Sequence, residues 1–138
     1  MEKILYADDE DDIREIIQNI LSKENYEVIL ARDGNEALKL AKEKNPDLIV
    51  LDYLMPGLTG DQVCEALKKD TQTQHIPIII ITAYLNEKEK SLSAGAIDFI
   101  NKPIERTDLL LRIKAVLKVR NIKNELQKLI AYIEELER

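Results

Sequence analysis

The sequence contains little of what marks several common classes of protein. Its only cysteine, Cys64, cannot form an internal disulfide, which agrees with the reducing cytosol rather than with a disulfide-stabilised secreted domain. No apolar run approaches the length of a membrane-spanning helix, and the opening residues turn acidic too soon for a signal peptide. No basic tract with interleaved aromatic residues is present. These absences predict a cytoplasmic protein that does not enter a membrane.

The net charge and the length of the chain further restrict the class of protein to which it can belong. The chain carries a net charge of −6 at pH 7, and an acidic surface repels the phosphate backbone of nucleic acids. We therefore expect no nucleic-acid binding by this chain alone. Its 138 residues suit one soluble domain with a proper core and a small appendage.

Short apolar runs alternate with amphipathic stretches, which predicts an α/β protein with a parallel sheet. Strands are expected at residues 4–6, 28–30, 48–51, 78–81 and 99–100, and helices at 13–21, 35–44, 61–69, 86–93 and 105–138. The third and fourth strands are unbroken aliphatic runs, as in strands that helices cover on both faces. The helix at 86–93 has few large apolar residues, so we expect it to be mobile or to bind a partner.

Residues 105–138 contain no proline or glycine and are expected to form one helix of about 51 Å. The preceding domain should be only about 35 Å across, so the end of this helix should project from it. Six apolar residues of the projecting part have the spacing of a coiled-coil seam, namely Val119, Ile122, Leu126, Leu129, Ile133 and Leu136. The seam is short, and a parallel pair would bring Lys118 opposite Lys123. The pattern is therefore typical either of a dimerising or signalling helix or of an amphipathic helix that packs on something else.

Polar residues stand where four of the expected strands end. Asp8 and Asp9 follow the first strand, Asp52 ends the third, Thr82 ends the fourth, and Lys102 follows the fifth. Each has an ordinary structural reading by itself, as a helix cap, a turn former or a solvated charge. The carboxyl ends of parallel strands share one edge of the sheet, where ligands bind in open α/β folds. The conjunction therefore predicts a single site.

The residue types indicate phosphoryl chemistry with a divalent cation. Clustered carboxylates repel one another, and a hard cation such as Mg²⁺ removes that cost while also binding phosphate oxygens. A carboxylate can attack phosphorus to give an acyl phosphate, while the metal and a lysine neutralise charge on the transferring group. The hydroxyl of Thr82 could donate to a phosphoryl oxygen. No glycine-rich loop follows the first strand, which disfavours a nucleotide or flavin site.

Over residues 1 to about 118 the chain resembles the receiver domains of bacterial response regulators. The matching segments are ILYADDEDDIRE, PDLIVLDYLMPGLTGDQVCEAL, IPIIIITAY and AGAIDFINKPI. The resemblance implies a flavodoxin-like, doubly wound sheet of five parallel strands in the order 2-1-3-4-5, with five helices. It also implies a role in two-component signal transduction, with a sensor histidine kinase or a phosphotransfer protein as the phosphoryl donor. The expected division is a receiver domain at 1–118 and a helical extension at 119–138.

The same resemblance assigns roles at the expected site. Asp52 would be the phosphorylated residue. Asp9 would bind Mg²⁺ directly and Asp8 mainly through water, with Asp52 and the backbone carbonyl of Leu54 as further ligands. Lys102 would pair with the phosphoryl group.

Two further positions would make the domain a switch. Thr82 would move toward the phosphoryl oxygen, and Phe99 would be the aromatic switch residue, at a place where many relatives have tyrosine. Because phenylalanine lacks the hydroxyl, burial alone would have to separate its two rotamers. The peptide bond before Pro103 is expected to be cis. The change should reshape the surface around the fourth helix and the fifth strand and so bias dimerisation or partner binding.

The positions two residues beyond Asp52 and Thr82 bear on how long a phosphoryl group would persist. Leu54 and Tyr84 are bulky, and neither is a carboxylate or an amide that could orient water, so we expect slow self-dephosphorylation and no enzymatic activity beyond Mg²⁺-dependent self-phosphorylation. An aspartate-nucleophile phosphatase would need an acid at the position of Leu54. A flavodoxin-like carrier is the third reading, which the acidic loop after the first strand disfavours.

The output of the signal is left open by the residues. No output domain follows the long helix within this sequence. The chain is therefore expected to be either a piece of a longer protein or a stand-alone or phosphorelay regulator that acts by protein binding without dimerisation.

Overall fold

Each strand of the sheet is a short run of mostly aliphatic residues, and the computed structural model describes the whole chain, residues 1–138. The strands are β1 (Lys3–Ala7), β2 (Glu27–Ala31), β3 (Leu48–Asp52), β4 (Ile78–Thr82) and β5 (Asp98–Asn101). All neighbouring strands pair in parallel, and their order is β2-β1-β3-β4-β5. Every residue of β3 and β4 is buried, as their unbroken aliphatic runs predict. The expected flavodoxin-like sheet is confirmed.

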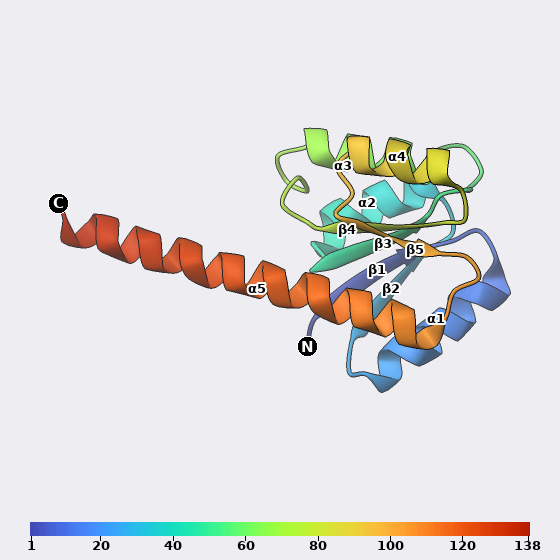
Figure 1. Ribbon diagram of the computed structural model, residues 1–138, viewed down its shortest axis with the longest axis horizontal. Coiled ribbons are helices and arrows are strands. Elements are labelled where there is room, and N and C mark those ends of the chain that lie inside the picture. The colour runs from blue at the N-terminus through green and yellow to red at the C-terminus, as the bar shows by residue number, and fades with distance from the viewer.

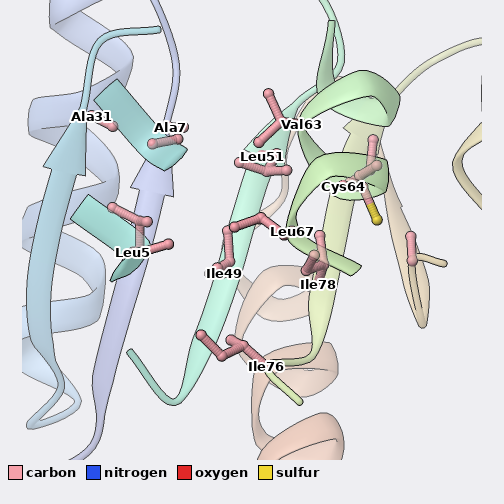
Figure 2. Packing of buried hydrophobic residues seen from close by; sticks show 14 of the residues in the cluster. Leu5, Ala7, Ala31, Ile49, Leu51, Val63, Cys64, Leu67, Ile76 and Ile78 are labelled. Atoms are coloured by element: carbon pink, nitrogen blue, oxygen red, sulfur yellow. The ribbon is translucent and has the colours of Figure 1, made fainter. Parts of the chain in front are cut away.

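Helices cover both faces of this sheet (Figure 1). They are α1 (Asp11–Lys23), α2 (Gly34–Lys44), α3 (Gly60–Lys69), α4 (Leu85–Ser93) and α5 (Arg106–Leu136). One core of 16 buried residues lies between the sheet and α2 and α3, and Figure 2 shows Ile49 and Leu51 of β3 in it beside Val63 and Leu67 of α3. A second core of 14 buried residues lies between the opposite face and helices α1 and α5. Helices therefore pack on both faces of the central strands, and this packing fixes the position of the carboxyl ends of β3 and β4.

Local signals set the ends of the helices that flank this edge. The side chain of Asp33 caps α2 by accepting from the backbone N–H of Glu36, at 2.8 Å. At the other end of α2, Asn45 takes the left-handed conformation directly before Pro46, which cannot continue a helix. Thr59 and Gln62 form a capping box at the start of α3.

The helix α4 is held to the body by few contacts. Its only fully buried residue is Ser91, whose hydroxyl donates to the backbone carbonyl of Glu87 at 2.7 Å. Leu85 and Leu92, its large apolar residues, are both exposed. The thin apolar face expected from the sequence is therefore present. Whether α4 moves or binds a partner stays a prediction.

The helix α5 is continuous over 31 residues and changes its surroundings halfway along. Its first part packs on the sheet through Leu109, Leu110, Ile113, Val116 and Leu117. Its second part projects far beyond the body (Figure 1). The last helix extends from the domain as expected, whereas a coiled coil stays a prediction. None of the helices is both long enough and apolar enough to cross a bilayer.

Candidate functional site

Three carboxylates meet at the carboxyl edge of the sheet. Carboxylate oxygens of Asp8, Asp9 and Asp52 all lie within 4.8 Å of one another. Asp8 and Asp52 are each only 4% exposed, whereas Asp9 is open to solvent. The arrangement brings together residues from the ends of β1 and β3, because these two strands are neighbours in the sheet.

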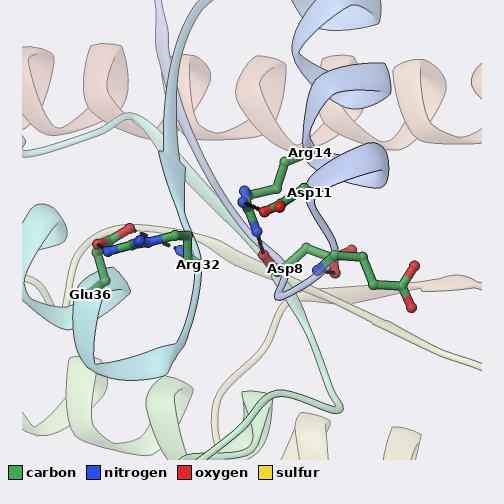
Figure 3. A network of polar contacts seen from close by, with 6 residues as sticks. Asp8, Asp11, Arg14, Arg32 and Glu36 are labelled. Carbon is green, nitrogen blue, oxygen red and sulfur yellow. Dashed lines mark hydrogen bonds and ion pairs between the residues drawn. The ribbon is translucent and has the colours of Figure 1, made fainter.

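Neighbouring donors hold Asp8 in place. The Tyr6 hydroxyl donates to one Asp8 carboxylate oxygen at 2.9 Å, and the backbone N–H of Glu10 donates to the other at 3.0 Å. The guanidinium of Arg14 donates to the Asp8 backbone carbonyl at 2.8 Å and also pairs with Asp11 (Figure 3). Burial, followed by the charge of Asp8, raises the pKa of Tyr6, so its hydroxyl stays protonated and remains a donor.

Lys102 is the positive partner of Asp52. The Lys102 ammonium nitrogen lies 2.8 Å from Oδ1 of Asp52, an ion-pair distance. Apart from this ion pair, no hydrogen-bond donor reaches that buried oxygen. Burial raises the pKa of Asp52 above its ordinary value, although Lys102 opposes that change. Burial lowers the pKa of Lys102, but its contact with Asp52 raises that pKa on balance.

This set of donors fits a hard divalent cation. Mg²⁺ prefers oxygen ligands and is usually held by one or two carboxylates together with water and phosphate oxygens. The three aspartates supply such oxygens, and the only polar partner of the buried Oδ1 of Asp52 is the Lys102 ammonium. Leu54, whose carbonyl is a further candidate ligand, follows β3 in the loop beside the cluster.

The end of β3 is packed tightly against the start of α3. The backbone N–H of Gly60 donates to the carbonyl of Tyr53 at 2.8 Å. A methyl group added at Gly60 would lie only 2.8 Å from the backbone oxygen of Asp52, so no larger residue fits without a shift of the strand. This contact therefore fixes the backbone that carries Asp52.

A groove of about 340 Å³ opens beside the carboxylates. One wall is polar and contains Asp8, Glu10, Asp52 and Lys102. The other wall is apolar and comes from α1 and the loop after β5, through Ile13, Ile16, Ile17, Ile20, Pro103 and Ile104. The peptide bond between Lys102 and Pro103 is cis, as the resemblance implies.

Thr82 is the last residue of β4 and is fully buried. Its hydroxyl forms a hydrogen bond with a residue of α4. Oγ1 of Thr82 donates to a carboxylate oxygen of Glu87 and accepts weakly from the backbone N–H of Tyr84 at 3.3 Å. The hydroxyl hydrogen is therefore directed to α4 rather than to Asp52. We did not expect a role for Glu87 from the sequence, where it reads as an ordinary acid in the first turn of a helix.

Phe99 is half-buried, and α4 also contacts it. The ammonium nitrogen of Lys88 lies 4.9 Å from the centroid of the Phe99 ring, within the range of a cation–π contact. Lys88 also donates to the side chain of Asn101. The two remaining candidate residues, Leu54 and Tyr84, are 54% and 61% exposed at the rim of this edge.

Comparison of the sequence with known proteins points to one family. The family model of the response regulator receiver domain matches residues 4–114. The probable transcriptional regulator ycf27 of Porphyridium aerugineum is 44% identical over 119 residues, which is 85% of this chain and 48% of that protein. The chain thus spans about half the length of this curated relative.

Solved structures agree with this match. The chemotaxis response regulator CheY4 of Vibrio cholerae is 32% identical, with a TM-score of 0.80 over 84% of this chain and 98% of that one. The receiver domain of the sensor histidine kinase PA1611 from Pseudomonas aeruginosa is 27% identical, with a TM-score of 0.79 over 85% of this chain and 98% of that one. That structure has a magnesium ion coordinated in its active-site cleft.

Proposed function

This chain belongs to the response regulator receiver domain family, and from this premise we propose that it stores a phosphoryl group on Asp52. Receiver domains act in two-component signal transduction through phosphorylation. The observation that carries the proposal is the pairing of Asp52 with Lys102 at 2.8 Å beside two further aspartates. Residues 1–118 would form the receiver domain and residues 119–138 the helical extension.

The reaction would be an in-line transfer from a phosphorylated histidine. A carboxylate oxygen of Asp52 forms a bond to phosphorus while the bond between phosphorus and the histidine nitrogen breaks. The nitrogen leaves with the electron pair, and the product on this chain is an acyl phosphate. Lys102, already at ion-pair distance from Asp52, would bind a phosphoryl oxygen and so offset its charge.

Asp8, Asp9, Asp52 and the backbone carbonyl of Leu54 would hold Mg²⁺ at this edge. A bound Mg²⁺ neutralises charge on the phosphoryl group during transfer. Tyr6 and Arg14 would act indirectly, because each fixes Asp8 by donating a hydrogen bond to it. Such supporting contacts orient metal ligands in proteins.

A sensor histidine kinase or a phosphotransfer protein would supply the phosphoryl group. The groove beside Asp52 supports this partner, because its apolar wall lies next to its polar one. An amphipathic helix fits such a groove when its apolar face also carries the reacting histidine. Ile16 of α1 is an exposed apolar residue on this wall and would contact the incoming helix.

The exposed rim residues favour storage over turnover. Neither Leu54 nor Tyr84 has the carboxylate or amide group that would orient a water molecule for attack on the phosphoryl group. We expect the double variant Leu54→Asn with Tyr84→Glu to lose its phosphoryl group faster than the wild type, by at least about tenfold. The measurement is the decay of radiolabelled protein after the phosphodonor is removed.

A matched control for this decay is available on α5. Leu111→Asn with Tyr132→Glu makes the same two replacements at exposed positions far along the chain from the site. Its decay should equal that of the wild type. If the site variant and the wild type lose the phosphoryl label at the same rate, Leu54 and Tyr84 do not determine the lifetime of the phosphorylated state.

The projecting part of α5 would join two copies of the chain. Its six seam residues are between 45% and 66% exposed. Ile122 comes about two and a half turns after Ile113, so it lies on the side of α5 opposite that buried residue. A second helix could pack on these exposed seam residues, and burying their apolar surface would favour dimerisation.

The dimer is tested by sedimentation over a concentration series, with and without Mg²⁺ and the phosphoryl mimic beryllofluoride. Leu126→Glu with Leu129→Glu should weaken association by at least about tenfold, because it places charges in the seam. Gln127→Glu with Lys128→Gln makes the same change in net charge outside the seam and should leave association unchanged.

The outcomes of sedimentation have distinct meanings. A shift from monomer to dimer on adding the mimic would couple the phosphorylation site to the helix. A dimer under all conditions would mean that the signal travels by rearrangement within it. A monomer throughout would contradict dimerisation through this helix, and α5 would then serve a different protein or a further domain.

A further inference from the structure

The hydroxyl of Thr82 can serve only one strong acceptor at a time. A hydroxyl has a single hydrogen to donate. In this structure it is donated to the carboxylate of Glu87, in the first turn of α4. The proposed function requires the same hydrogen at a phosphoryl oxygen on Asp52. The two acceptors must therefore compete.

The residue after Glu87 contacts two residues of the neighbouring strand. Lys88 lies over the ring of Phe99 and donates to the side chain of Asn101, both on β5. Consecutive residues of α4 thus contact the end of β4 and the end of β5. A movement of Thr82 away from Glu87 would remove one of these two attachments of the first turn.

The rest of α4 offers little resistance to such a movement. Ser91 is its only fully buried residue, and its larger apolar side chains are exposed. Segments with few buried apolar contacts shift or open at low free-energy cost. The attachment through Glu87 is therefore a substantial part of what sets the position of the first turn.

We propose that Glu87 is a positioning residue that holds Thr82 away from the phosphoryl site, so that phosphorylation of Asp52 must take the Thr82 hydroxyl from it and thereby release the first turn of α4. This inference rests on the proposed phosphorylation of Asp52. It identifies Glu87 as the group that competes with a phosphoryl oxygen for the Thr82 hydroxyl. This competition would link the phosphorylation site to α4. Removing the competitor should make the switched state easier to reach.

The experiment measures the affinity of the full chain for beryllofluoride in saturating Mg²⁺, by following backbone amide signals in an NMR titration. Glu87→Ala should bind the mimic more tightly than the wild type by roughly three- to tenfold, the effect of one hydrogen bond to a partly exposed carboxylate. Glu87→Gln keeps an acceptor without the charge and should lie between the two. In the free protein, the amide signals of the first turn should also move in Glu87→Ala.

Two controls separate this role from a general effect on the helix. Glu89→Ala removes the same charge from an exposed position of α4 and should leave the affinity unchanged. In a Thr82→Ala background Glu87→Ala should change the affinity by less than about twofold, because the competition no longer exists. Circular dichroism shows whether each variant keeps its fold.

The proposal and the function on which it rests fail differently. If the wild type binds the mimic but Glu87→Ala binds it no more tightly than Glu89→Ala does, Glu87 is only a first-turn acid. An effect of Glu87→Ala that persists without Thr82 would also overturn the proposal. A wild type that does not bind the mimic at all would overturn both the phosphorylation of Asp52 and the competition inferred from it.

Discussion

Replacement of Asp52 by asparagine should abolish incorporation of a phosphoryl group into this chain. The amide has nearly the shape of the carboxylate, but its oxygen is a poor nucleophile and gives no stable acyl phosphate. The ion pair with Lys102 would be lost together with the charge. Burial raises the pKa of Asp52, so replacing the carboxylate by a neutral group should not unfold the protein.

The measurement uses radiolabelled acetyl phosphate with Mg²⁺, in which the bond between phosphorus and the donor oxygen breaks and acetate leaves. The wild type should become labelled, and hydroxylamine should remove the label because it cleaves acyl phosphates. Asp12→Asn makes the same replacement at an exposed position near the site and should be labelled like the wild type. Label at another residue of Asp52→Asn would contradict the assignment.

Removal of Mg²⁺ by a chelator should reduce labelling of the wild type to background, and added Mg²⁺ should restore it. Without the cation, three clustered carboxylates would repel the incoming phosphoryl group. Asp9→Asn should lower the rate of labelling by roughly a hundredfold or more, because it removes one of the proposed ligands. Asp9 is exposed, so this variant should remain folded.

A direct binding measurement distinguishes loss of the metal from loss of the chemistry. Titration calorimetry with Mg²⁺ alone should show at least about tenfold weaker binding by Asp9→Asn than by the wild type. Glu15→Gln, an exposed acid on α1, is the control and should bind Mg²⁺ normally. Labelling that proceeds at the same rate in the chelator would contradict a role for Mg²⁺ in the transfer.

The arrangement of the sheet was readable from local patterns. The unbroken aliphatic runs of β3 and β4 are typical of strands covered on both faces, and the structure buries every residue of both. Asn45 and Pro46 stop α2 where the residue before proline avoids helical geometry. The candidate site followed from the same reading, because parallel strands end at one edge whatever their order.

The contacts that complete the site were not readable in this way. Tyr6 reads as one more large residue of a buried strand, and Arg14 and Glu87 read as ordinary charges on helices. Each acquires a role only through a partner that the fold brings to it, namely Asp8 for the first two and Thr82 for Glu87. Pairings of this kind depend on how far a flexible side chain reaches, which has no signature in spacing.

The long helix α5 shows most clearly which features follow from the sequence and which follow from the tertiary structure. Its continuity follows from the lack of proline and glycine after Pro103, and its apolar periodicity follows from the residues alone. Apolar residues occur at helical spacing both in the half that packs on the sheet and in the half that projects, so residue type alone cannot tell Ile113, which is buried, from Ile122, which is exposed. That difference arises because the two residues lie on opposite sides of α5, of which one packs on the sheet, and because the helix continues past the edge of the sheet. Local residue types thus determined the elements and the chemistry at the strand ends, whereas the finite extent of the sheet determined which apolar surface was left free to bind.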